Sequence, residues 1–127
     1  MKLSFKPPQG LIVVRAELTG PSGKAILRLA LDTGATSTLL NVGMLVAVGY
    51  DPALSRRRVE VTTGSGIEFA PRILASILRA LGQSRLRFPI LAHTLPPSAT
   101  VDGVLGLDFF PGCRLTVDFA QGTVDVR

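Results

Sequence analysis

Residues 31–40 read Leu31-Asp32-Thr33-Gly34-Ala35-Thr36-Ser37-Thr38-Leu39-Leu40, and this stretch is the most informative in the chain. Its Asp-Thr-Gly triplet follows one apolar run, residues 25–31, and precedes another. A hydrophilic turn between two buried segments brings the carboxylate of Asp32 out of the core at a sharp bend, where it can form the floor of a cleft. The triplet occurs once, whereas carboxylate chemistry of this kind needs two acids. We therefore expect a second copy of the chain to supply the other acid.

Length and composition favour one mainly β domain. The chain has 127 residues, 46% of them hydrophobic and 18% charged, which suits a single folded unit with a normal core. Val, Ile and Leu occur in short runs separated by 13 Gly and 9 Pro, a pattern typical of strands and turns. We expect one domain over residues 1–127, with residues 1–9 as a flexible N-terminal arm.

Several classes of site are disfavoured by residue counts. Cys113 and His93 are the only cysteine and histidine, which excludes an intrachain disulfide and a cysteine metal cluster and disfavours Ser-His-Asp or Cys-His chemistry. The net charge is +5, but its only basic run is Arg56-Arg57-Arg58, and the chain has six Phe, one Tyr and no Trp. A basic nucleic-acid-binding domain remains an alternative that rests on this charge alone, and we expect no nucleic-acid partner.

Membrane and export signals are not evident. The first eight residues lack the apolar core of a signal peptide, and no apolar run reaches the ~18 residues that span a bilayer. We expect no membrane segment in this chain and a cytoplasmic location, although the sequence is equally compatible with a soluble piece of a longer or anchored protein.

Alternating apolar and polar residues between Gly- and Pro-rich turns predict successive β-hairpins. Asn41 precedes a short helix that should run to about Val48 and end at Gly49, and Asp108 is placed to cap another. The expected strands are residues 11–18, 24–31, 37–40, 58–63, 67–70, 72–80, 85–92, 101–107, 115–119 and 123–126.

A second motif, Val101-Asp102-Gly103-Val104-Leu105-Gly106-Leu107-Asp108-Phe109-Phe110, follows the triplet about 70 residues later. A hairpin tipped by Gly64-Ser65-Gly66 lies between the two. This order of parts resembles the retropepsin-type aspartic proteases, which include the retroviral proteases and their single-domain bacterial and cellular relatives. The resemblance covers roughly residues 10–127. The chain is too short for the two-lobed pepsin form, which carries both triplets.

The resemblance implies a closed, barrel-like retropepsin fold, equivalent to half of an acid protease, with one or two short helices. It implies a two-fold homodimer and an aspartic endopeptidase in which two Asp32 carboxylates, one per subunit, activate a water by general acid and base catalysis. The substrate would be an extended polypeptide, and no metal or organic cofactor is required.

The resemblance also assigns roles around the catalytic Asp32. Thr33 would lock the two catalytic turns together across the two-fold axis, and Gly34 would allow close backbone approach. The remaining implied residues contact substrate: Ala35 from the turn, Ala30 and Val104 in apolar pockets, and the flap tip Thr63, Gly64, Ser65, Gly66 and Ile67.

Alternative interpretations of these motifs remain open. The triplet could be an ordinary turn, and the glycine-tipped hairpin could lack a flap role. Asp102 and Asp108 are interpreted as turn or cap residues and not as a second catalytic acid, although Asp102 is a candidate to border the cleft and favour basic side chains. A retropepsin-fold dimerisation or binding module that cleaves little is the main alternative function.

The chain departs from the viral pattern of the family. Viral members often pair acidic residues just after the catalytic turn with a basic residue that follows the buried glycine. This chain has Thr36 and Ser37 in the first places and Leu107 after Gly106. The ion pair that supports the dimer in those viral members is therefore not expected in this chain.

Overall fold

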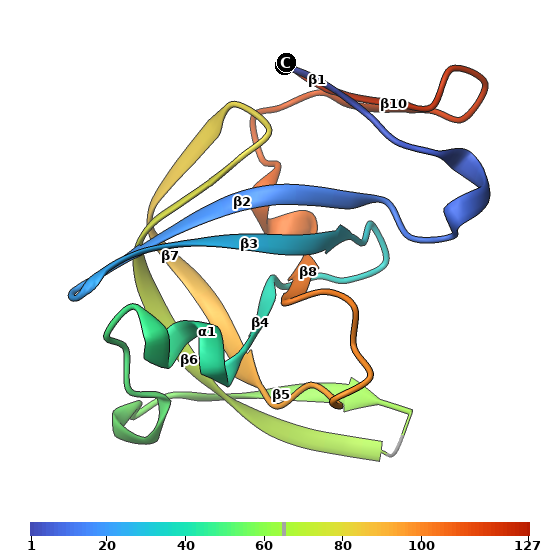
Figure 1. The fold of residues 1–127 in the computed structure, drawn as a ribbon. Coiled ribbons are helices and arrows are strands. Elements are labelled where there is room, and N and C mark those ends of the chain that lie inside the picture. The colour runs from blue at the N-terminus through green and yellow to red at the C-terminus, as the bar shows by residue number, and fades with distance from the viewer. Residues whose placement is uncertain (65) are drawn as a thin grey trace.

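The computed structural model describes residues 1–64 and 66–127, apart from the side chains of Gln9 and Thr63. Its main body is a β-barrel (Figure 1). The sheet order β2-β3-β8-β4-β7-β6 closes on itself because β2 also pairs with β6, and β5 extends β6 outward. These strands are β2 (Val13–Gly20), β3 (Gly23–Leu31), β4 (Leu39–Asn41), β5 (Arg58–Thr63), β6 (Gly66–Ala80), β7 (Gln83–His93) and β8 (Gly103–Leu105). The prediction of a mainly β, closed barrel is confirmed.

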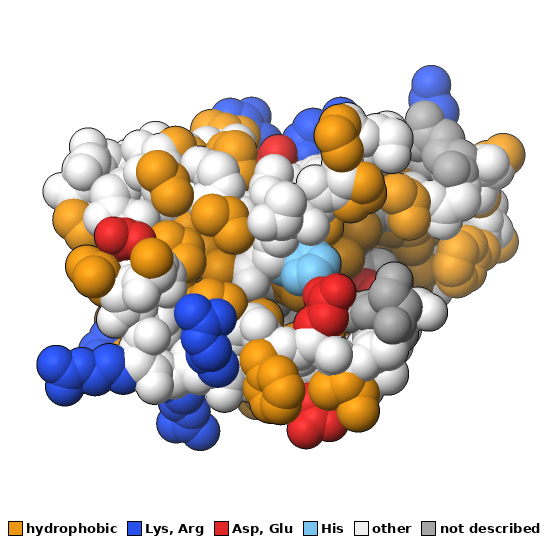
Figure 2. Space-filling view, turned by 90° about the horizontal axis from the view of Figure 1, so that it is seen from below, with side chains coloured by type: hydrophobic (Ala, Val, Ile, Leu, Met, Phe, Trp, Pro, Cys, Tyr) orange, Lys and Arg blue, Asp and Glu red, His pale blue; other side chains and the backbone are white. Residues whose placement is uncertain are grey.

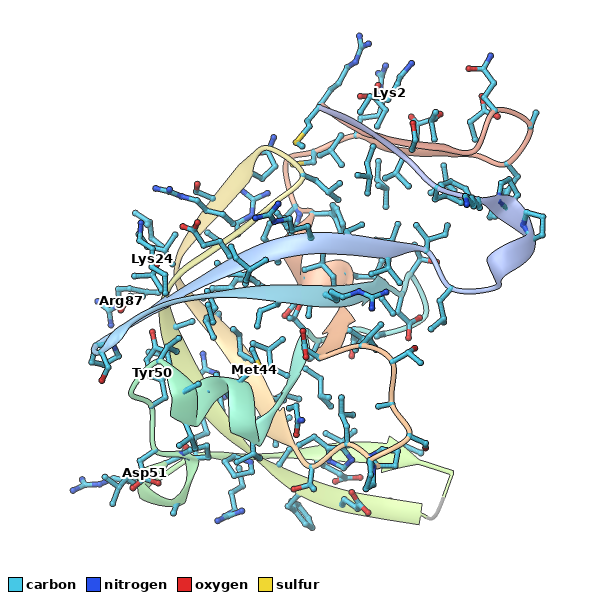
Figure 3. All side chains as sticks on the ribbon, viewed as in Figure 1. Lys2, Lys24, Met44, Tyr50, Asp51 and Arg87 are labelled. Atoms are coloured by element: carbon cyan, nitrogen blue, oxygen red, sulfur yellow. The ribbon has the colours of Figure 1, made fainter. Side chains whose placement is uncertain are left out.

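Period-two alternation explains how the barrel buries its core. In β2, Val14, Ala16 and Leu18 are at most 2% exposed, whereas Arg15 between them is exposed. Successive side chains of a strand point to opposite faces, so one face of β2 lines the core. In Figure 3, Lys24 of β3 and Arg87 of β7 point away from the barrel, and both are exposed.

The long strand β6 differs from the prediction of two strands separated at Pro71. Residues 66–71 of β6 pair with β5, and residues 72–80 pair with β7. Pro71 lies where β6 changes partner, so its missing N–H interrupts neither ladder. One continuous strand therefore carries both the hairpin with β5 and a wall of the barrel.

The helices are short, as predicted. They are α1 (Val42–Ala47) and the 3-10 turns η1 (Pro7–Gln9), η2 (Pro52–Leu54) and η3 (Leu107–Phe109). Neither expected cap residue caps its helix: the Asn41 side chain accepts a hydrogen bond from the Leu95 amide at 3.5 Å, and Asp108 lies inside η3. Tyr50, labelled in Figure 3, ties the end of the α1 region to the barrel because its hydroxyl donates to the Thr19 carbonyl at 2.7 Å.

A separate sheet joins the two ends of the chain. Its order is β1 (Lys2–Ser4), β10 (Thr123–Val126) and β9 (Leu115–Asp118), all antiparallel. The strand β1 was not expected, because residues 1–9 were predicted to be a flexible N-terminal arm. Figure 1 shows this sheet and the β5–β6 hairpin at opposite ends of the barrel. In the described part of the chain, no helix is long and apolar enough to cross a membrane.

Candidate active site

The Asp32 turn begins where β3 ends, and backbone hydrogen bonds hold its start. The Asp32 amide donates to the Leu105 carbonyl at 3.0 Å, and the Leu31 amide donates to the Ile12 carbonyl at 2.8 Å. Within the turn, the Asp32 carboxylate accepts a hydrogen bond from the Gly34 amide at 3.0 Å. Asp32, Thr33 and Gly34 are all exposed. The chain thus presents one carboxylate at its surface on a well-anchored turn.

The second sequence motif lies directly beside this turn. Strand β8 runs parallel to β3, with Val104 beside Ala30, and antiparallel to β4. The backbone approaches closely here, because a Cβ at Gly103 would lie 2.1 Å from the Leu39 carbonyl oxygen. Only a residue without a side chain fits at that point. The glycine of the motif therefore allows β8 to insert between β3 and β4.

A buried polar contact joins the motif to the segment after the turn. Thr38 is 0% exposed, and its amide and hydroxyl donate to the two carboxylate oxygens of Asp108 at 3.0 and 2.7 Å. The same hydroxyl accepts a hydrogen bond from the Gly106 amide at 3.1 Å. The Leu107 amide also donates to the Ala35 carbonyl at 2.8 Å. These bonds brace the residues that follow Asp32.

The turn borders a cleft of about 510 Å³. Of the residues expected at the site, Asp32, Gly34, Ala35 and Val104 line it. Ala30 is only 5% exposed and is not among the lining residues. The other lining residues are Thr36, Ser37, Leu39, Glu60, Val61, Thr62 and Leu91.

The expected flap residues lie at the end of the β5–β6 hairpin. Thr63 is the last residue of β5 and pairs with Gly66, the first of β6, and Ile67 is 62% exposed. Gly64 precedes the tip, and Ser65 lies outside the described residues. None of the described tip residues is among those that line the cleft of this single chain. The hairpin instead lines it through residues 60–62 of β5.

Sequence reasoning missed this contribution of β5. Its alternating pattern predicted the strand, with the same bounds, but not which edge borders the cleft. Which residues of β5 border the cleft depends on how the hairpin is placed relative to the barrel. The cleft is also lined by residues far away in sequence, such as Leu91 and Val104. Among the lining residues, Asp32 and Glu60 carry the only charged side chains.

Asp102 does not border the cleft, in contrast to the role considered for it. Its carboxylate accepts a hydrogen bond from the Arg28 amide of β3 at 2.8 Å, and Asp102 is not among the lining residues. Another acid, Glu68 of β6, lies 3.6 Å from His93 at the end of β7. In Figure 2 the pale blue histidine lies beside an acidic side chain at a hollow of this face. This contact links the hairpin to the barrel body outside the cleft.

No group of three or more His, Cys, Asp or Glu side chains is arranged to hold a metal ion in the part of the chain that the structure describes. The site combines the exposed Asp32 carboxylate on its braced turn with a partly polar cleft that Glu60 also lines. A carboxylate is a group that can accept and donate protons.

The chain was compared with known proteins. Residues 14–109 match the family model described as Aspartyl protease. Comparison with curated protein sequences finds no significant match.

Among solved structures, the chain is similar to a retropepsin-like aspartic protease from Rickettsia conorii. The TM-score is 0.69 and the identity 12%, over 99% of this chain and 90% of the other. This likeness confirms the predicted fold. The family match includes the Asp-Thr-Gly triplet, residues 101–109 of the second motif and most of the barrel, and this chain therefore belongs to the aspartyl protease family.

Proposed function

We propose that the chain is an aspartic endopeptidase that works as a homodimer, with one Asp32 carboxylate contributed by each subunit. The observation that carries the proposal is the exposed Asp32 on its braced turn at the edge of the cleft. One carboxylate alone cannot be both the acid and the base of peptide hydrolysis, and a second copy related by a two-fold axis supplies the missing one.

The two carboxylates of the dimer take different roles in the reaction, one as the base and the other as the acid. Like charges a few ångströms apart cannot both ionise readily, so the pair shares one proton. The ionised carboxylate accepts a proton from a water molecule as that water attacks the scissile carbonyl. The protonated carboxylate donates a hydrogen bond to the carbonyl oxygen and then supplies a proton to the leaving nitrogen. No other group is needed for these proton transfers.

The surrounding residues would position substrate and turn. Thr33 would join the two catalytic turns across the axis, and Gly34 and Ala35 would lie against the substrate backbone. The hairpin tip, residues 63–67, would close over the peptide and exclude water. Val104, which lines the cleft, would contact apolar substrate side chains.

The substrate would bind as an extended strand. Strand β5 is the last in its sheet, so among the described strands one of its edges has no partner, and its residues 60–62 line the cleft. A peptide laid against that edge would gain main-chain hydrogen bonds whatever its sequence. Main-chain recognition of this kind suits an endopeptidase that cuts within a chain.

Cleavage of a peptide library by the wild type and by Asp32→Asn tests the proposal. The wild type should cut internal peptide bonds, and the variant should have no activity above the uncatalysed rate, because the only carboxylates of the proposed pair are removed. Circular dichroism should show the variant folded, since Asp32 is exposed. A variant that cuts as fast as the wild type would show that Asp32 is not catalytic. A wild type that dimerises and binds peptides without cutting them would instead support a binding module.

A further inference from the structure

The cleft has an unusual charge for this chain. The protein has a net charge of +5, yet the two charged residues that line the cleft, Asp32 and Glu60, are both acidic. The remaining lining residues are Gly, Ala, Ser, Thr, Val and Leu. A basic group that enters the cleft therefore meets negative charge and no lining cation. Asp32 is assigned to the reaction, which leaves Glu60 without a role.

Glu60 differs from the other acids of the chain because its carboxylate has no partner among the described residues. Each of the other carboxylates accepts a hydrogen bond or lies within 4 Å of a basic side chain. Glu17 lies 3.6 Å from Lys24, and Glu68 lies 3.6 Å from His93. The six aspartates contact backbone amides, or for Asp125 the side chain of Arg127. Glu60 is exposed and available to a ligand.

The position of Glu60 on β5 defines which part of a ligand it would meet. On one side Glu60 faces Phe69 of β6 across the hairpin, and the other edge of β5 has no partner strand among those described. A peptide added to that edge would place one residue directly opposite Glu60. Directly opposed residues of neighbouring strands project to the same face, with their Cβ atoms ~4.5–5.5 Å apart. This distance suits a pair of opposite charges.

We propose that Glu60 gives the cleft a preference for peptides with a lysine or arginine at the position opposite it on an added strand. The inference rests on the proposed endopeptidase function and names its substrate class. The pair is exposed to solvent, so the preference should be modest, ~3- to 5-fold for a basic residue over a neutral one of similar shape.

Matched peptides test the preference. Peptides that the wild type cuts, or that the Asp32→Asn variant binds, are resynthesised at each position with lysine, norleucine or glutamate. The value of kcat/KM is measured at ~0.15 M salt to screen the field of the whole protein. At one position the wild type should prefer lysine ~3- to 5-fold. Glu60→Gln should abolish this ratio, and Glu60→Lys should reverse it in favour of glutamate. Charge reversal is a gain of preference that a misfolded variant cannot produce.

Glu68→Gln is the matched control, because it removes the same charge from the adjacent strand but lies outside the lining residues. It should keep the preference for lysine. A wild type without basic preference, a Glu60→Gln variant that retains it, or an equal loss in Glu68→Gln would each overturn the proposal.

Measurements of peptide binding distinguish a failure of this inference from a failure of the proposed function. Fluorescence anisotropy of labelled peptides with the Asp32→Asn variant measures the same ratio without cleavage, and a further Glu60→Gln change should remove it. If the wild type cuts nothing, the endopeptidase proposal fails while the binding ratio still decides the role of Glu60. If cleavage occurs but neither ratio depends on Glu60, the inference alone fails.

Discussion

Asp108 holds Thr38 through two hydrogen bonds, although the residues are 70 positions apart in the chain. Thr38 is fully buried, and its hydroxyl also accepts a hydrogen bond from the Gly106 amide. The segment that follows the Asp32 turn is thereby joined to the second motif inside the barrel. The position of the proposed catalytic carboxylate thus depends on an acid that takes no part in the proposed chemistry.

Two substitutions of Asp108 should distinguish the contribution of its hydrogen bonds to stability from the contribution of its negative charge. Asp108→Ala leaves the Thr38 amide and hydroxyl without an acceptor and should lower the free energy of unfolding by about 2–3 kcal/mol. In Asp108→Asn, the amide oxygen can accept from the Thr38 amide while the NH₂ group donates to its hydroxyl, so the loss should be about 1 kcal/mol. Urea unfolding of both variants measures the difference. Equal losses would show that the negative charge, and not the two bonds, stabilises this contact.

Gly106→Ala should displace the turn directly. A Cβ at this position would lie 2.7 Å from the carbonyl carbon and oxygen of Ser37 and 2.9 Å from the Ala35 carbonyl oxygen. Because these are backbone atoms, relief of the clash must move the segment that carries Asp32. We expect a loss of about 1–3 kcal/mol in the free energy of unfolding and a lower kcat.

Gly43→Ala in α1 is the control for this substitution. No atom lies within 4 Å of its added Cβ, so alanine should stabilise the protein by about 0.5–1 kcal/mol through its higher helix propensity. Thermal unfolding and peptide hydrolysis measure both variants. A Gly106→Ala protein as stable and active as the wild type would show that the backbone tolerates the shift.

The barrel could be predicted because its strands alternate and its turns contain glycine. Residues 58–63 were predicted with the bounds that β5 has. The continuation of β6 past Pro71 could not be predicted, because proline often ends a strand. Pro71 lies here where β6 changes partner from β5 to β7, and such a change is a property of the whole sheet. Strand β1 was missed for a similar reason: its three residues acquire structure by pairing with β10 at the other end of the chain.

At the candidate site, features marked by a local motif could likewise be predicted, whereas contacts between distant segments could not. The Asp32 turn and β8 are each marked by a motif, and the structure places them side by side. Asp108 resembled a helix cap because it precedes a short apolar helix, yet its partner, Thr38, is contributed by a distant segment. Glu60 carried no signal, since a charged residue in an alternating strand resembles any solvent-facing position.

Dilution tests whether a second subunit completes the site. A lone chain presents one Asp32, so specific activity should fall as dimers dissociate, and sedimentation velocity should show monomer over the same concentrations. Addition of an equal amount of Asp32→Asn subunits should leave about a quarter of the dimers with two aspartates if pairing is random. Activity that tracks total wild-type subunits in both experiments would show that each chain works alone.

The pH dependence of hydrolysis should report the shared proton. The proposed reaction needs one ionised and one protonated carboxylate, so activity should be lost at low pH, where both carry a proton, and at higher pH, where neither does. The plot of kcat/KM against pH should therefore be bell-shaped. Both limbs belong to the pair, because its members are chemically identical in the free dimer.

His93 and Cys113 lie outside the lining residues, and His93→Gln and Cys113→Ser should preserve the shape of the profile. A rate that rises through neutrality to an alkaline plateau would require a different base and would remove the Asp32 pair from the mechanism.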